Sequence, residues 1–144
     1  MKIGISACLA GDSVRYDGRH KKDDILMELL KGHEIVKICP EMESGFTVPR
    51  DTIELTDGKA VTKNGKDVSD ELSEGSGRCL EMIKDCDFVI LKSRSPSCGY
   101  GFVYDGSFSG KLIDGNGVFA KMCIGKGIRV FTELDLDRIE KELK

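Results

Sequence analysis

The stretch Leu91–Gly101, LKSRSPSCGYG, changes abruptly from apolar to polar sequence. It follows the apolar run FVIL at residues 88–91, which predicts a short buried strand. Cys98 then lies in a loop of Ser, Pro and Gly. A cysteine in such a loop, just beyond a buried strand, is expected on a surface rim rather than in the core.

An apolar, strand-like run ends in a cysteine at two further places. Residues 2–7 lead into Cys8, and residues 34–38 lead into Cys39. If these runs and the one before Cys98 are parallel strands of one sheet, their carboxyl ends lie along the same edge, where such sheets place their sites. The sequence therefore predicts that the three thiols converge there.

Helical patterns separate the strand-like runs. We expect helices over about 23–31, 67–85 and 116–124, and a last helix that Thr132 opens with Asp135 in a capping-box pattern. We expect strands at 2–7, 34–38, 87–92 and 128–131, and a hairpin at 53–63 turning at Asp57-Gly58. We expect a Gly- and Asp-rich loop at 8–22 and an irregular loop at 40–50. This alternation predicts one α/β domain, residues 1–144, with a mainly parallel sheet.

Composition narrows the class of protein. The chain has 144 residues, 40% hydrophobic and 33% charged, as in soluble globular domains. Its formal charge of -3 provides no overall basic field for nucleic acid, although a local basic patch remains compatible with it. With no leader and no run of membrane-spanning length, we expect a cytoplasmic protein without a membrane partner.

The six cysteines fall into two groups. Cys79, Cys86 and Cys123 lie among apolar residues and are expected to be buried structural thiols. The other three form no C-x-x-C pair, which argues against a zinc ribbon, a bacterial ferredoxin run or a thiol-redox motif. Spacing alone supports equally a metal site built from three separate loops and a set of scattered thiols.

Three cysteines are one fewer than the usual four ligands of a cubane iron–sulfur cluster. A cluster held by three thiolates leaves one iron open, as Lewis-acid chemistry requires, and that iron favours a soft atom such as sulfur. Glu41 follows Cys39 by two residues and is placed for proton transfer there. The alternative is a solvated loop glutamate.

Other polar residues of these loops are candidate site residues. Ser95 and Ser97 could orient a water or hydrogen-bond a cluster sulfur, or could simply stabilise a turn. A polar wall for an anionic or nucleobase-like substrate is suggested by Arg15, Tyr16, Arg50, Lys92 and Arg94, each of which could instead be ordinary solvated surface.

Residues 115–120, GNGVFA, match the dinucleotide pattern G-x-G-x-x-A, with Glu133 after a later strand. A true fingerprint follows directly on a strand, whereas irregular Asp/Gly/Ser sequence precedes this one. We therefore interpret it as the start of a helix.

Together, several motifs resemble the thiouracil desulfurase family over nearly the whole chain. They are Ser6–Leu9, Val14–Gly18, Cys39–Glu41, Pro49-Arg50, Gly65–Val68, Leu91-Lys92 and Ser95–Gly99, followed by Tyr104–Gly106, Phe108–Gly110 and Gly115–Val118.

The resemblance implies a Rossmann-like, three-layer αβα domain holding a [4Fe-4S] cluster by three cysteines, here Cys8, Cys39 and Cys98. The open iron would bind a thiocarbonyl sulfur, Glu41 would handle protons and Ser95 would assist. Water would replace the sulfur without net redox change, and sulfide would be released. The implied substrates are small thiolated bases or nucleosides such as 2-thiouracil, extending to tRNA-derived thionucleosides; no protein partner is implied.

In one respect the chain departs from the family pattern. Ser44 stands where the first of two adjacent glycines is usual, and it would narrow the site if that backbone had to approach substrate or adopt a positive φ angle. Two other functions are compatible with the residues. One is an iron–sulfur or zinc module that carries sulfur or binds a ligand without turnover. The other is a thiol-redox enzyme, which requires a cysteine of low pKa.

Overall fold

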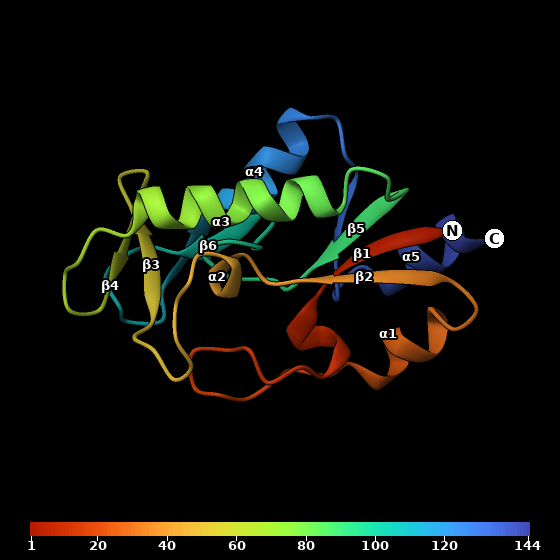
Figure 1. Cartoon of the computed structure of the whole chain (residues 1–144), viewed down its shortest axis with the longest axis horizontal. Helices are drawn as coiled ribbons and strands as arrows, with labels where there is room; N and C mark the ends of the chain where they lie inside the picture. Colours follow the sequence, from red (N-terminus) through yellow and green to blue (C-terminus); the bar gives the residue numbers. More distant parts are fainter.

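The computed structural model describes all 144 residues, and its centre is a four-stranded parallel sheet. The strands are β1 (Lys2–Ser6), β2 (Glu34–Ile38), β5 (Phe88–Leu91) and β8 (Val130–Thr132), in the order β2-β1-β5-β8 (Figure 1). All three strand pairs are parallel. The predicted α/β class with a parallel sheet is confirmed.

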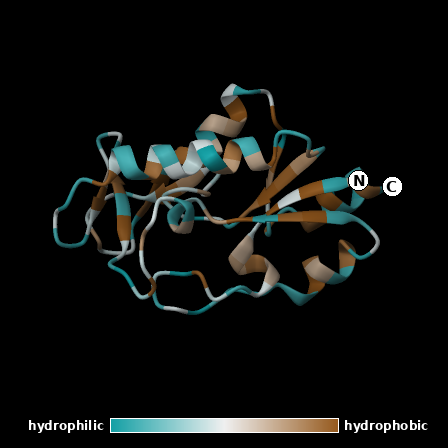
Figure 2. Cartoon of the chain, viewed as in Figure 1, coloured by the Kyte–Doolittle hydropathy of each residue, from teal (hydrophilic) through white to brown (hydrophobic).

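Alternation along the strands produces a core on each face of the sheet. On one face Ile3, Ile5 and Ile90 pack with helices α1 (Asp24–Leu29) and α5 (Leu136–Leu143). On the other face Val89 and Leu91 pack with α3 (Ser69–Met82) and α4 (Val118–Gly125). Figure 2 shows the hydrophobic residues concentrated along the strands, between the helical layers. The result is a three-layer αβα arrangement.

Two hairpins lie beyond the carboxyl ends of the sheet, at the end of the molecule away from both termini (Figure 1). One joins β3 (Ile53–Thr56) to β4 (Lys59–Thr62), and the other joins β6 (Phe102–Tyr104) to β7 (Leu112–Asp114). Asp57 and Gly58 have φ angles of 49° and 78°, so the predicted two-residue turn is confirmed. A small core of Ile53, Ala60, Val68 and Leu72 joins the first hairpin to α3.

Three local predictions were wrong. The segments after β1 and β2, expected to be irregular, form the 3-10 helix η1 (Ala7–Ala10) and the short helix α2 (Pro40–Glu43). Pro40 at the first helical position explains α2, because proline needs no hydrogen bond there. The last helix begins at Leu136, with Asp135 as its N-cap, rather than after Thr132, because Thr132 is the last residue of β8. One contact of the expected capping box is nevertheless present, since the N–H of Thr132 donates to the Asp135 carboxylate at 2.9 Å.

No helix of the structure combines the length and the apolar character needed to cross a membrane.

The two glycines of α3 have different surroundings. A Cβ added to Gly75 would lie 2.5 Å from the backbone nitrogen of Ser44 and 2.6 Å from the carbonyl of Pro40, because α2 packs directly on this turn. A Cβ added to Gly77 would have no neighbour within 4 Å. Gly75 therefore permits the contact that positions α2, whereas Gly77 only weakens the helix.

Replacing each glycine by alanine tests this difference. Gly75→Ala should destabilise the protein by about 1–3 kcal/mol, the usual effect of overpacking. Gly77→Ala, on the exposed side of the same helix, should stabilise it by up to about 1 kcal/mol through helix propensity. Urea denaturation measures both, and equal shifts of the two midpoints would contradict the packing role of Gly75.

Candidate active site

The three strand-end cysteines line a single cavity of about 490 Å³. Cys8 lies in η1 after β1, Cys39 is the N-cap of α2 after β2, and Cys98 lies in the loop after β5. The chain leaves β1 toward β2 on one side and later returns to β5 on the other side. The cavity thus lies beyond the switch point of the sheet, where α/β folds place their ligands.

Burial keeps the cavity thiols protonated at neutral pH. The pKa of Cys8 is raised to about 11, mainly by burial and to a smaller extent by the nearby Cys39, whereas Lys92 and Arg15 lower it. Burial also raises the pKa of Cys39, which the backbone N–H of Met42 partly offsets. For Cys98 burial raises the pKa well above the usual value, opposed by the hydroxyls of Ser6 and Ser97. The prediction that Cys98 lies on a surface rim rather than in the core was wrong, because this residue is 4% exposed and packs in the core between α3, α4 and the sheet.

The remaining three cysteines do not line the cavity. Burial raises the pKa of Cys79 and of Cys123 to about 12, and it also raises that of Cys86. Their predicted role as structural thiols agrees with these positions, since Cys79 and Cys123 are wholly buried in the core between α3, α4 and the sheet.

The cavity supplies a sulfur-rich donor set. No three His, Cys, Asp or Glu side chains are grouped closely enough to hold one metal ion. The cysteine ligands of a cubane bind different irons, so they surround the cluster instead of meeting at one point. Cys8, Cys39 and Cys98 on the cavity wall fit that requirement. The nearby cations Arg15 and Lys92 favour the thiolate form of Cys8, and Arg50 favours that of Cys39.

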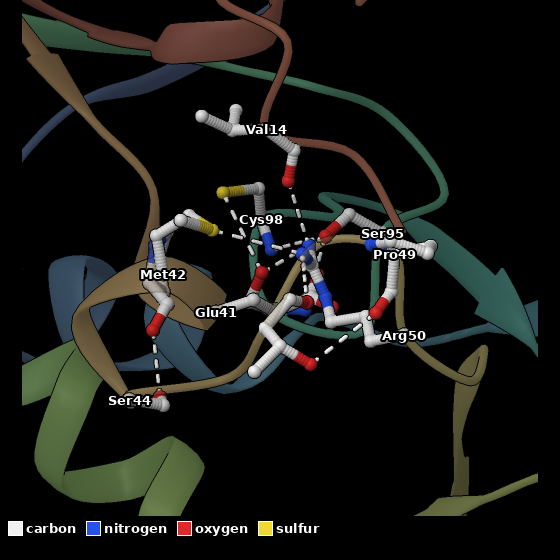
Figure 3. A network of polar contacts seen from close by, with 11 residues as sticks. Val14, Glu41, Met42, Ser44, Pro49, Arg50, Ser95 and Cys98 are labelled. Carbon is white, nitrogen blue, oxygen red and sulfur yellow. Dashed lines mark hydrogen bonds and ion pairs between the residues drawn. The ribbon is translucent and has the colours of Figure 1, made fainter. Parts of the chain in front are cut away.

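Glu41 forms a buried ion pair with Arg50 beside these thiols (Figure 3). Arg50 Nε lies 3.2 Å from Glu41 Oε1, and the two side chains are 8% and 15% exposed. Arg50 also donates to the carbonyls of Val14, at 2.8 Å, and Thr47, at 3.3 Å. One arginine therefore ties three loops together. Glu41 is not the solvated loop residue of the alternative interpretation, and its Oε2 accepts no hydrogen bond from the protein.

The hydroxyl of Ser95 organises the cysteine loop. Its oxygen accepts from the N–H groups of Ser97, at 3.1 Å, and Cys98, at 3.0 Å. It also shares a 3.0 Å hydrogen bond with the Ser97 hydroxyl, which in turn donates to Cys98 Sγ at 3.8 Å. Both serines also line the cavity, so each of them stabilises the turn and belongs to the site at the same time.

The same loop occupies the N-terminus of α4. The N–H of Val118 donates to the carbonyl of Pro96 at 2.9 Å, and that of Phe119 donates to Ser97 at 2.8 Å. A Cβ on Gly117 would lie 2.5 Å from the Ser97 carbonyl oxygen, so glycine is required for this approach. The interpretation of GNGVFA as a helix start is confirmed, and its N–H groups are engaged by the loop instead of being free for a pyrophosphate.

The predicted polar wall lines the cavity in full. The guanidinium of Arg15 lies over the Tyr16 ring, 5.6 Å from its centroid, and the backbone N–H of Arg50 donates to the Tyr16 carbonyl. Lys92 pairs with Glu133 at 3.0 Å, which gives this glutamate a structural partner within the protein. Arg94 is exposed and has a φ angle of 68°.

Sequence reasoning missed the wall that the two hairpins contribute. Glu54 and Lys63 come from the first hairpin, and Tyr104, Phe108 and Gly110 come from the second. Aromatic residues within a Gly/Ser-rich stretch were the available signal for Tyr104 and Phe108. Nothing in the sequence indicated that these hairpins face the strand-end cysteines.

Ser44 does not narrow the cavity. Its φ angle is -76°, and its hydroxyl donates to the Pro40 carbonyl at 2.6 Å on the side of α2 that faces α3 (Figure 3). The positive φ angle of this segment belongs to Gly45, at 84°. The serine that replaces the usual glycine of the family therefore does not narrow the cavity, because the Ser44 side chain lies between α2 and α3.

Comparison with known proteins agrees with this geometry. The family model of 2-thiouracil desulfurase matches residues 3–135. The uncharacterized protein YbbK of Bacillus subtilis (strain 168) is 39% identical over 149 aligned residues, covering 95% of this chain and 99% of its own. A solved structure, the [4Fe-4S]-dependent thiouracil desulfidase TudS (DUF523Vcz), is 36% identical with a TM-score of 0.91 and covers 99% of this chain and 97% of its own.

The family model extends over all the strands of the parallel sheet and every loop of the cavity. This chain therefore belongs to the 2-thiouracil desulfurase family.

Proposed function

We propose that this protein is an enzyme that removes sulfur from a thiolated nucleobase or nucleoside resembling 2-thiouracil, using a [4Fe-4S] cluster. Cys8, Cys39 and Cys98 would hold the cluster and leave one iron open. The observation that carries this proposal is the placement of these three thiols and the buried Glu41–Arg50 pair on one cavity. The structural similarity to a protein described as a [4Fe-4S]-dependent thiouracil desulfidase supports this proposal.

When bound, the cluster supplies a Lewis-acidic iron for the thiocarbonyl sulfur. The overall exchange, in which water oxygen replaces sulfur and hydrogen sulfide leaves, is balanced without any electron donor. Glu41 takes a proton from the attacking water at Oε2, the oxygen that has no partner in the protein, and returns it to the departing sulfur. Arg50 holds the carboxylate in place from the opposite oxygen.

The remaining cavity residues position the substrate and the water. Ser95 can release its hydrogen bond to Ser97 and donate to the water or to the base, because that bond lies at the cavity wall. Arg15, Tyr16, Arg50 and Ser97 are the proposed substrate-binding residues: their N–H and O–H groups can donate to the carbonyl oxygen of the base, and the hydroxyl oxygens of Tyr16 and Ser97 can accept from its ring N–H groups. Thiolated nucleosides derived from tRNA present the same acceptors.

Metal analysis tests the ligand set directly. Anaerobically prepared protein should be brown, contain about four irons per chain and release sulfide from 2-thiouracil. Serine at position 8, 39 or 98 should remove most of the iron, since each replaces a proposed thiolate. Cys86→Ser, which lies outside the cavity, should keep it. Colourless wild-type protein that stays inactive after cluster reconstitution would overturn the proposal.

Glu41→Gln separates an enzyme from a sulfur-carrying module. The amide keeps the shape of the side chain but cannot take a proton, so kcat for sulfide release should fall by about 10²–10⁴-fold while the iron content is unchanged. Glu43→Gln is the matched control, because Glu43 lies on the same helix, outside the cavity, and pairs with Arg78. Equal sulfide release by both variants would favour a carrier without turnover.

Thiol alkylation tests the thiol-redox alternative. Because every cysteine pKa is raised, the thiolate fraction of cluster-free protein is small at pH 7, on the order of 10⁻⁴ for Cys8. Alkylation should therefore be slower than that of free cysteine and should accelerate about tenfold per pH unit as pH rises toward 11. Iodoacetamide labelling followed by mass spectrometry measures each site. A cavity thiol that reacts faster than free cysteine at pH 7 would revive the redox interpretation.

A further inference from the structure

Phe108 is an aromatic residue of the cavity wall that the fold itself does not use. It is half-buried, yet it belongs to none of the three hydrophobic cores and is not among the residues packed against them. The aromatic pair of the protein is Phe88 with Phe131, and no cation lies over the Phe108 ring. Phe108 therefore lines the cavity, and its ring takes part in no core, aromatic pair or cation–π contact of the protein.

The backbone at Phe108 is held in an unfavourable conformation. Its φ angle is 57°, a left-handed value that is unfavourable for a bulky residue. Besides Asp57 in its hairpin turn, the residues other than glycine with positive φ are Arg94 and Phe108, and both line this cavity. Both strained residues line the same cavity, which indicates that their side-chain positions serve the site at the expense of loop stability.

A buried carboxylate maintains this conformation. Glu54 of β3 is 9% exposed, and its Oε1 accepts from the N–H groups of Gly106 and Phe108, both at 3.0 Å. Within the loop, the Asp105 carboxylate accepts from the N–H of Ser107 at 2.9 Å. The tip of the β6–β7 hairpin is thus fastened to the neighbouring hairpin, and Phe108 is fixed at the cavity before any ligand arrives.

The chemistry of the ring indicates what it recognises. Phenylalanine has no polar atom, so it can offer a ligand only its apolar face or edge. The Tyr16 ring of the same cavity is already covered by the Arg15 guanidinium. Stacking of a base on an aromatic side chain contributes about 1–3 kcal/mol and accepts any flat heteroaromatic ring.

We propose that Phe108 is a specificity-determining residue whose ring stacks on the planar ring of the thiolated base. This inference rests on the proposed function, because it concerns the substrate of the same cavity. It predicts selection for cyclic, planar thiocarbonyl compounds over small acyclic ones such as thiourea, which have no ring to stack. The polar wall then determines orientation, and Phe108 determines which class of molecule is retained.

The test uses cluster-loaded protein and compares Phe108→Gly, Phe108→Leu and Phe108→Tyr. For Phe108→Gly we expect KM for 2-thiouracil to rise about 5–100-fold, corresponding to the stacking contribution, with kcat changed less than about twofold. The dissociation constant of uracil, measured by calorimetry, should rise in parallel, because uracil has the same ring and is not consumed. Phe108→Leu should resemble Phe108→Gly, Phe108→Tyr should restore both constants, and turnover of thiourea should be unaffected.

Stability and a matched control separate binding from a structural role. Since glycine adopts a φ angle of 57° without strain, Phe108→Gly should unfold at the same or a higher temperature than the wild type. Phe102→Leu removes an aromatic ring from the same hairpin outside the cavity and should leave KM and uracil binding unchanged. The inference is overturned if uracil binding is unaffected in Phe108→Gly, or if binding, iron content and unfolding temperature fall together.

Failure of this inference can be told from failure of the proposed function. Wild-type protein that releases no sulfide from 2-thiouracil contradicts the desulfurase function, whereas the uracil measurements still decide the role of Phe108. If the wild type releases sulfide but binds no uracil at millimolar concentration, the stacking role is wrong and the desulfurase function stands.

Discussion

The parallel pairing of β1 with β2 and β5 is the constraint on which the whole site depends. Ser6 is opposite Ile38, and Ile5 is opposite Ile90, so the three strands end along one edge of the sheet. Each strand then continues directly into a cysteine-bearing segment. A five-residue strand is about 17 Å long, so reversing one of them would carry its thiol to the far edge of the sheet. Convergence of the sulfurs is therefore a consequence of strand direction.

Hydrogen bonds to buried polar groups make this edge rigid. Arg50 binds a carboxylate on α2, the carbonyl of Val14 in the loop after η1 and the carbonyl of Thr47 in its own loop. The cysteine loop accepts hydrogen bonds from the start of α4. Burying an ion pair brings little net stability, because desolvation of both charges offsets most of their attraction. The Glu41–Arg50 pair is better understood through what it positions, a cavity-lining carboxylate with one oxygen that has no hydrogen-bond partner in the protein, than as a contribution to folding.

The two hairpins give the cavity a second wall of different character. The sheet edge contributes sulfur atoms and the groups around them, whereas the hairpins contribute Glu54, Tyr104 and Phe108. The first hairpin is held to α3 by the small core around Leu72, and the Glu54 carboxylate fastens the second hairpin to the first. Neither hairpin contributes a strand to the main sheet.

The sequence by itself determined the strands, the parallel α/β class, the Asp57-Gly58 hairpin and the strand-end position of Cys8, Cys39 and Cys98. These features follow from local hydrophobic periodicity and turn chemistry, which a short window of residues contains. Only the tertiary structure decided that α2 forms over four residues, that Glu41 is buried against Arg50, that Ser44 faces α3 and that Phe108 lines the cavity. The contacts of Ser44 with Gly75 of α3 and of Phe108 with Glu54 join residues far apart in the chain, and Glu41 and Arg50 pair across a segment without hydrophobic periodicity. A short window of sequence therefore contains no pattern that predicts them.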